Sequence, residues 1–210
     1  MLRMVPLPVP GRFIRIFNMI EGLFPSARAE GSTTLADPLP ALPAAVSAVK
    51  EYLRIEGSAE DALLARLIAV AIEQGERWTG RSFVRRQMRM VVRSGPGWQR
   101  LGPGPVTWIG AIERWSPDGI GAALPVSAFH IDIDGIGDGW VRVRDTSIRR
   151  VRVTFTAGMA EEWSEMPEPL AQGVLRLAAH LYTHRDTRDE AAPPAAIAAL
   201  WRPWRRLSLA

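Results

Sequence analysis

Residues 58–80 read SAEDALLARLIAVAIEQGERWTG and contain the clearest helical pattern in the sequence. The apolar residues of this stretch recur every three or four positions, which is the spacing of one face of a helix. This stripe consists of Leu64, Leu67, Ile68, Ala71, Ile72, Gly75 and Trp78. Ser58 followed by Asp61 has the form of a capping box, and Gly80 is a typical residue for a helix end. After Gly80 the apolar period shortens to two, so we expect strands to follow the helix.

Helical periodicity also appears on both sides of this central region. Upstream, AAVSAVKEYLRI from Ala44 predicts a short helix that ends at Gly57. Downstream, a helix is expected after Pro167, whose ring fits a first helical turn. Its buried stripe would be Leu170, Val174, Leu177, Ala178 and Leu181. A last short helix is expected over 195–200, before Pro203 breaks the chain.

The middle of the chain alternates apolar and polar residues, as strands do. The apolar members are Met88, Met90 and Val92, then Val106, Trp108 and Ile112, then Phe129, Ile131 and Ile133, and finally Trp140 and the trio Val151, Val153 and Phe155. The intervening GPGWQRLGPGP is interpreted as a stiff surface loop, and SPDG at 116–119 as a turn. We therefore predict an α+β fold: a helical core with two helices before the sheet, one long helix after it and a short C-terminal helix, around an antiparallel β-rich middle with one apolar face.

The pattern divides the chain into three parts. Residues 1–43 are expected to be an extended arm, because the closing prolines exclude a helix interior there. Residues 44–190 are expected to form the main domain, and 191–210 a short helix and tail. Within the main domain the predicted helices lie at 44–80, the β-rich part at 82–157 and the last long helix at 167–185.

Composition excludes several classes of protein. The 210 residues include no cysteine, which rules out disulfides, zinc–thiolate sites and thiol nucleophiles. The 26 basic and 22 acidic residues give a net charge of +4, so contact with phosphate is possible but the chain is no polycation. No run approaches the roughly 18–20 apolar residues of a membrane span. We expect no membrane partner and a location inside the cell or in an assembly.

Motifs for catalysis, cofactors or metals are incomplete. His180 and His184 have the spacing of a metal pair on a helix, but no third ligand is evident, and packing explains them better. DIDGIGDG at 132–139 allows either a calcium loop or a hairpin turn, and the apolar Ile136 at a ligand position favours the turn. No phosphate-binding loop or nucleophile elbow occurs. The sequence predicts no enzyme, no cofactor and no metal site.

Two groups of basic and aromatic residues are candidates for interaction. Arg85, Arg89, Arg150 and Arg152 fall on the polar side of predicted strands and could face another subunit, solvent or DNA. The C-terminal stretch AALWRPWRRLSLA supplies the other group, because its indoles are expected to lie outside any element that could bury them. These candidate docking residues are Leu200, Trp201, Arg202, Trp204, Arg205 and Arg206.

The order of three motifs resembles a known family. VKEYLRIEGSAEDALLARLIAVAIEQGERWTGRSF at 49–83, VRVTFTAGM at 151–159 and MPEPLAQGVLRLAAHLYTHRD at 166–186 are similar to the head-to-tail connector, or adaptor, proteins of tailed bacteriophages and of phage-derived gene transfer agents. The resemblance extends from about residue 46 to about residue 204. The long N-terminal arm and the arginine- and tryptophan-rich ending depart from the family pattern.

The resemblance implies a function. Such adaptors form a ring, commonly of twelve subunits, between the portal protein and tail-side stopper or tail terminator proteins. The ring extends a channel through which DNA passes without sequence-specific binding. The chain would then be assembled in the bacterial cytoplasm and reside at the head–tail interface of a phage or gene transfer agent particle. The alternative hypothesis is a nucleic-acid-binding accessory protein that uses the arginine-rich sheet faces.

Overall fold

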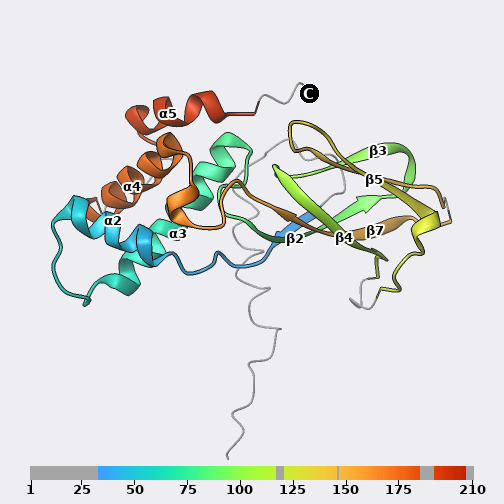
Figure 1. Cartoon of the computed structure of the whole chain (residues 1–210), viewed down its shortest axis with the longest axis horizontal. Coiled ribbons are helices and arrows are strands. Elements are labelled where there is room, and N and C mark those ends of the chain that lie inside the picture. The colour runs from blue at the N-terminus through green and yellow to red at the C-terminus, as the bar shows by residue number, and fades with distance from the viewer. Residues whose placement is uncertain (1–32, 117–120, 146, 185–191, 207–210) are drawn as a thin grey trace, which may run out of the picture. The chain divides into compact units, whose positions relative to one another are not determined.

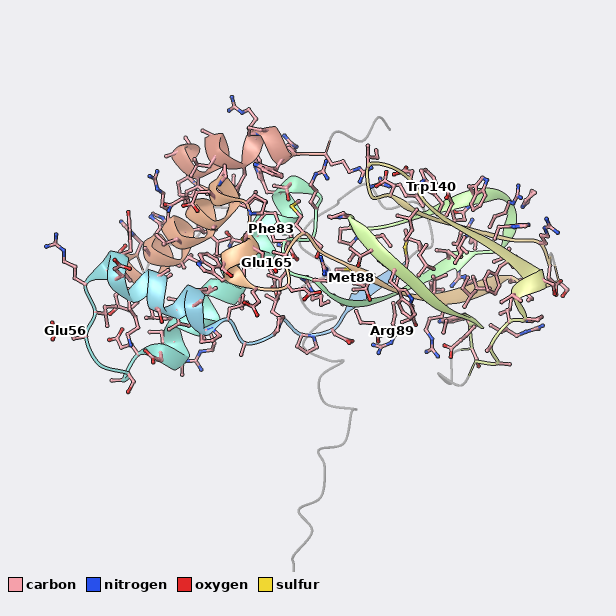
Figure 2. The ribbon with its side chains drawn as sticks, in the orientation of Figure 1. Glu56, Phe83, Met88, Arg89, Trp140 and Glu165 are labelled. Carbon is pink, nitrogen blue, oxygen red and sulfur yellow. The ribbon has the colours of Figure 1, made fainter. Side chains whose placement is uncertain are left out.

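The computed structural model describes residues 33–116, 121–145, 147–184 and 192–206. Figure 1 shows the helices gathered into one group and the strands into another. Each group has its own cluster of buried apolar side chains. Phe83 belongs to the core of the helices and Met88 to the core of the strands, and the two can be compared in Figure 2. The predicted α+β class is confirmed.

The helical group is built from α2 (Pro43–Leu53), α3 (Asp61–Thr79), α4 (Glu168–Thr183) and α5 (Ala195–Trp201). The expected stripe of α3 is buried, with Leu64, Ile68 and Ile72 almost without exposure. The stripe of α4 is buried in the same core, against α3 and α5. Short 3₁₀ turns precede α4 (η3, Trp163–Glu165) and follow α5 (η4, Arg202–Trp204). Helical periodicity therefore identified the packing faces correctly.

The predicted ends of the first two helices need correction. The capping box is wrong, because α3 begins at Asp61 after Glu60 and has no side-chain cap. Asp61 instead forms an ion pair with Lys50 of α2 at 2.8 Å. Helix α2 stops at Leu53, since Arg54 already has left-handed backbone angles (φ 57°), so Gly57 does not end it. The predicted stop at Gly80 is confirmed (φ 71°).

The strands form two antiparallel sheets. The first has four strands in the order β1–β2–β7–β4, and the second has three in the order β3–β6–β5. Their bounds are β1 Thr33–Ala36, β2 Arg86–Arg93, β3 Gly95–Leu101, β4 Val106–Arg114, β5 Phe129–Ile133, β6 Gly139–Val143 and β7 Arg150–Ala157. One apolar core, with residues such as Met88, Val141 and Phe155, contains side chains of both sheets. The second sheet covers the apolar face that a single sheet would leave in water.

One predicted loop is a strand. GPGWQRL forms β3, which pairs with β6 and lies at an edge of the three-stranded sheet. The register shifts between Gly95 and Gln99, around the proline at position 96. Prolines are tolerated on edge strands and at bulges, so the Gly-Pro pattern concealed a strand of this kind.

A bulge in β4 overturns a second prediction. The alternation predicts Trp108 on the same face as Val106, but the Trp108 side chain is 52% exposed while Val106 is buried. The register with β7 shifts between Val106 and Trp108, so Thr107 and Trp108 are both exposed in succession. The indole ring lies over Gly110, where an added Cβ would come within 1.9 Å of it. Bulges redirect side chains in this way.

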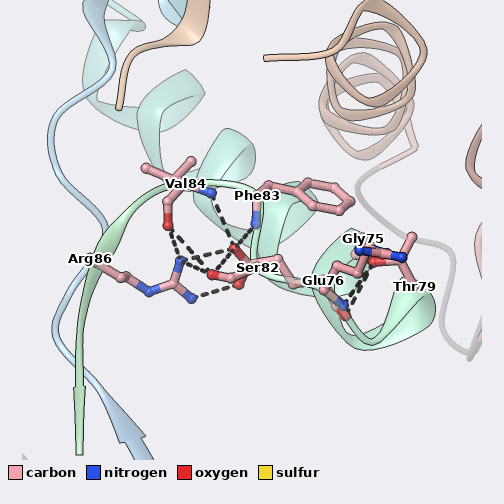
Figure 3. Close-up of polar contacts among 8 residues, drawn as sticks. Gly75, Glu76, Thr79, Ser82, Phe83, Val84 and Arg86 are labelled. Carbon is pink, nitrogen blue, oxygen red and sulfur yellow. Dashed lines mark hydrogen bonds and ion pairs between the residues drawn. The ribbon is translucent and has the colours of Figure 1, made fainter. Parts of the chain in front are cut away.

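A buried ion pair joins α3 to β2. Glu76 is 8% exposed, and its Oε1 accepts hydrogen bonds from the backbone N–H of Phe83 at 2.7 Å and from Arg86 at 2.9 Å. Its Oε2 pairs with Arg86 Nη2 at 2.5 Å. Ser82 completes the network, which Figure 3 shows in close-up. A buried carboxylate with this many donors fixes the exit of α3 relative to the first strand that follows it.

Candidate functional site at the C-terminal segment and the arginine face

The C-terminal segment, defined here as residues 195–206, is attached to its own chain by Trp201. This side chain has no exposed surface and belongs to the core of the helices. It fills space that two helix glycines leave open, since a Cβ on Gly173 would lie 2.1 Å from Trp201 Nε1 and one on Gly75 would lie 3.1 Å from its ring. The indole N–H donates to the carbonyl oxygen of Leu170 at 3.4 Å. The expectation that no element could bury this indole is wrong.

The remaining docking candidates are also held by the chain. Trp204 is half-buried against the same core, and its carbonyl oxygen accepts a hydrogen bond from Arg81 Nε at 3.0 Å. The Arg205 guanidinium lies 5.3 Å from the centre of the Trp78 ring. The backbone N–H of Arg206 donates to Thr79 at 2.7 Å. Leu200 is half-buried, whereas Arg202 and Arg205 are exposed.

Asp138 connects this segment to the three-stranded sheet. Its carboxylate is 5% exposed, pairs with Arg206 and contacts Arg100 Nε at 3.2 Å. Burial and the neighbouring Arg206 both lower the pKa of the Arg100 guanidinium. The carboxylate, with two cations beside it, therefore fastens the end of the C-terminal segment to the turn before β6.

The turn that carries Asp138 answers the question raised by DIDGIGDG. Asp134 accepts hydrogen bonds from the backbone N–H of Ile136 at 3.1 Å and of Asp138 at 2.8 Å, and from Trp140 Nε1 at 3.1 Å. These bonds lower the pKa of the Asp134 carboxyl, and the bond from Trp140 has the largest effect. The segment is a hairpin turn between β5 and β6, which agrees with the favoured interpretation. Within the described ranges no group of three or more acidic or histidine side chains is arranged to hold a metal ion.

The arginine face is defined here as the side of β2 and β7 opposite the buried one, and it carries three of the four predicted arginines. Arg89 and Arg152 lie on the side of β2 and β7 opposite the buried one, and each pairs with an acid: Arg89 with Asp37 at 2.9 Å and Arg152 with Glu113 at 2.7 Å. Figure 2 labels Arg89 beside Met88, its neighbour on the buried side. Arg150 differs, because its guanidinium lies over the ring of Trp115, 5.6 Å from the ring centre. The fourth, Arg85, precedes β2 and pairs with Glu161.

Sequence reasoning missed the features that hold these residues. The acid Glu76 on an otherwise apolar stripe was a visible signal for the buried ion pair with Arg86. The glycines at 75 and 173, on the buried faces of two helices, were the signal for the space that Trp201 fills. The pairing of Arg206 with Asp138, 68 positions earlier, left no local signal.

Comparison with known proteins gives results at the level of structure alone. No protein-family model matches the sequence, and no functionally characterised sequence matches it. Chains in solved structures share its fold, and in three of them the match covers 84% of this chain and 97% of the other.

All three structures are of gene transfer agent (GTA) particles. A chain in the neck of an empty particle, computed with C6 symmetry, has a TM-score of 0.66 at 24% identity. A chain in the virion of a native particle has 0.64 at 26% identity, and one in the neck of a native particle, computed with C12 symmetry, has 0.61 at 25% identity. The resemblance to the head-to-tail connector family is thereby confirmed, since the chain shares its fold with neck chains of gene transfer agent particles.

Proposed function

We propose that the chain is a structural adaptor that forms a ring in the neck of a phage or phage-like particle, between the portal and tail-side stopper or terminator proteins. The observation that carries the proposal is the fold match to chains of two GTA necks and of a GTA virion, over almost the whole length of those chains. Those assemblies were computed with C6 and C12 symmetry, and a ring of twelve copies of this chain is proposed by analogy. DNA would pass through the ring without being read.

Surface features support a role in assembly. Among the described residues, Trp98 and Trp108 are the tryptophans with large exposure, 42% and 52%. They lie on β3 and β4, each at an edge of its sheet. Exposed aromatic side chains are enriched at protein interfaces, and a cyclic ring needs two different contact surfaces on every subunit. We propose that neighbouring copies or tail-side proteins cover these two indoles.

We further propose that the C-terminal segment docks on the portal through its exposed cations. Trp201 holds the segment to its own chain, so Arg202 and Arg205 are the charges available to acidic groups on a partner. Arg206, which pairs with Asp138, and Trp204, which packs against the core of the helices, would hold this surface in place. The division of the chain into an arm (1–43), an adaptor domain (44–190) and a C-terminal segment with its tail (191–210) is part of the same proposal, with the arm joined to the adaptor domain where β1 pairs with β2.

The alternative, a nucleic-acid-binding protein acting through Arg85, Arg89, Arg150 and Arg152, has less support. Three of the four arginines are neutralised by acids of the same chain. We propose no catalytic role, because the chains that share the fold belong to particle necks and a particle. Within the described part of the chain, none of the helices has both the length and the apolar character that crossing a membrane requires.

Electron microscopy and co-sedimentation with the portal protein test the proposal. The full chain mixed with portal should give rings stacked on portal particles.

Truncating the C-terminal segment would remove Trp201 from the core, so the sharper variant is R202E/R205E, which reverses two exposed charges. The matched control, R66E/R176E, makes the same change at exposed positions on α3 and α4. We expect only R202E/R205E to lose co-sedimentation. Full retention by R202E/R205E contradicts portal docking, and the absence of any ring on the portal contradicts the adaptor role.

A further inference from the structure

A cavity with an unusual concentration of arginines lies at one end of the four-stranded sheet. Its volume is about 610 Å³, and it is formed where β2 and β4 end and β7 begins. The side chains that matter for its chemistry are Arg93, Arg114, Trp115, Ile148, Arg149 and Arg150. Among the residues that the structure describes, none that lines the cavity is acidic.

The backbone around the cavity is fixed by hydrogen bonds between the strand ends. The N–H of Ser94 donates to the carbonyl oxygen of Arg149 at 3.0 Å, and the N–H of Trp115 donates to that of Arg150 at 3.0 Å. Ile148 is 5% exposed and belongs to the core between the sheets. The arginines are therefore carried on an ordered frame, with Arg150 stacked on the Trp115 ring.

The charges of this cavity are not balanced within the described residues. Arg93 and Arg150 are direct cross-strand partners, an arrangement that destabilises a sheet when the charges are alike. Within the described ranges, none of Arg93, Arg114, Arg149 and Arg150 forms an ion pair with an acid, whereas Arg89 and Arg152 on the same two strands each do.

Asp145 is an acid close to the cavity, and its carboxylate accepts hydrogen bonds from Ser147. Its Oδ1 accepts the N–H and the hydroxyl of Ser147 at 2.9 and 2.6 Å. These bonds, and after them the charge of Arg114, hold the pKa of the Asp145 carboxyl below its ordinary value. Within the described ranges, this one carboxylate does not offset four guanidinium groups.

We propose that this cavity binds the phosphate backbone of a nucleic acid. A guanidinium matches a phosphate group in shape as well as charge, because it offers paired donors in one plane. Duplex DNA carries one negative charge per about 1.7 Å of its axis, so one short segment supplies anions to several arginines at once. A protein partner would have to crowd several carboxylates together to do the same. Contacts of this kind hold DNA without selecting a sequence.

The test measures anisotropy of two fluorescein-labelled duplexes of unrelated sequence with the isolated full chain across a range of salt concentrations. The variant R114Q/R149Q removes two charges at exposed positions, and R66Q/R176Q removes two charges at exposed positions on α3 and α4 as the control. Each lost phosphate contact reduces the magnitude of the negative slope of log affinity against log salt by about 0.9. We expect R114Q/R149Q to reduce this magnitude by about 2 and to weaken the affinity by about tenfold or more, equally for both duplexes. The control should leave both unchanged.

Several results would overturn the proposal. The first is that the natural chain binds neither duplex. The second is that R114Q/R149Q and R66Q/R176Q lose equal amounts of DNA affinity. The third is that polyglutamate displaces DNA at the same concentration of charge. The last result would assign the cavity to acidic protein segments. Inorganic phosphate alone should compete weakly, since it occupies one contact at a time. If R114Q/R149Q does not fold, R149Q should reduce the magnitude of the slope by about 1. These measurements need no portal and no ring, so they succeed or fail independently of the adaptor role.

Discussion

The C-terminal segment and the arginine cavity are both rich in arginine and tryptophan, yet they differ in how their side chains are satisfied. In the C-terminal segment, Trp201 is enclosed by helix glycines and Arg206 pairs with Asp138. In the cavity, Arg93 lies opposite Arg150 on the neighbouring strand, and within the described ranges neither arginine forms an ion pair with an acid. Similar composition thus serves internal stability in one region and leaves unbalanced charge in the other. The composition of a segment therefore does not by itself show whether its tryptophans and arginines contact a partner.

The largest effect should come from Trp201→Ala. Removing a fully buried indole from a close-packed core costs about 3–5 kcal/mol, because the cavity that remains collapses only in part. Trp108→Ala, at a half-exposed position, should cost less than about 1 kcal/mol. Urea unfolding of both variants measures the difference. Equal costs would show that Trp201 does not support the fold.

An intermediate effect should appear at acid pH near Asp138, the anchor of the C-terminal segment. The pKa of the neighbouring Asp134 carboxyl is lowered in the folded chain from its ordinary value of 3.8, chiefly by the bond from Trp140. Its contribution to stability is therefore complete above that value and is lost as the pH falls through the lower folded pKa.

Thermal unfolding between pH 5 and pH 2.5 tests this contribution. The natural chain should lose more stability than Asp134→Asn over this range, because the variant has no carboxylate to protonate. Asp132→Asn, on the adjacent strand β5, is the control and should follow the natural chain. Parallel curves for all three chains would contradict the assignment.

The smallest effect should come from relieving the like charges of the cavity. Arg93→Thr should stabilise the chain by about 0.2–1 kcal/mol, the range for one cross-strand pair. Arg89→Thr removes an arginine that pairs with Asp37, so it should give no such gain. Unfolding at low salt measures both, since salt screens the repulsion. A loss of stability in Arg93→Thr would mean that the cavity is balanced by other groups.

The parts of the fold that could be predicted from the sequence are those that depend on residues close together in the chain. Periodicity located the buried faces of α3 and α4, and alternation located β2 and β7, because burial repeats locally along an element. It failed at β3 and at Trp108, where a proline and a bulge interrupt the alternation. It also failed for Trp201, since the space that receives this indole comes from glycines 28 and 126 positions away.

The candidate site was less predictable than the fold for the same reason. The sequence does not distinguish Arg150 from the other three arginines, which are Arg85, Arg89 and Arg152. The structure shows that these three form ion pairs with acids, whereas Arg150 stacks on Trp115. Ion pairs between distant segments follow from the tertiary fold. A local pattern therefore identified charged strands but not the unbalanced cavity.

Hydroxyl-radical footprinting of the tryptophans, in the free chain and in assembled particles, tests whether Trp201 serves the fold while Trp98 and Trp108 serve assembly. We expect Trp201 to be protected in both states, whereas Trp98 and Trp108 are oxidised in the free chain and protected after assembly. Oxidation of Trp201 in the free chain, with protection gained only in the particle, would contradict this division and make that indole the contact with a partner.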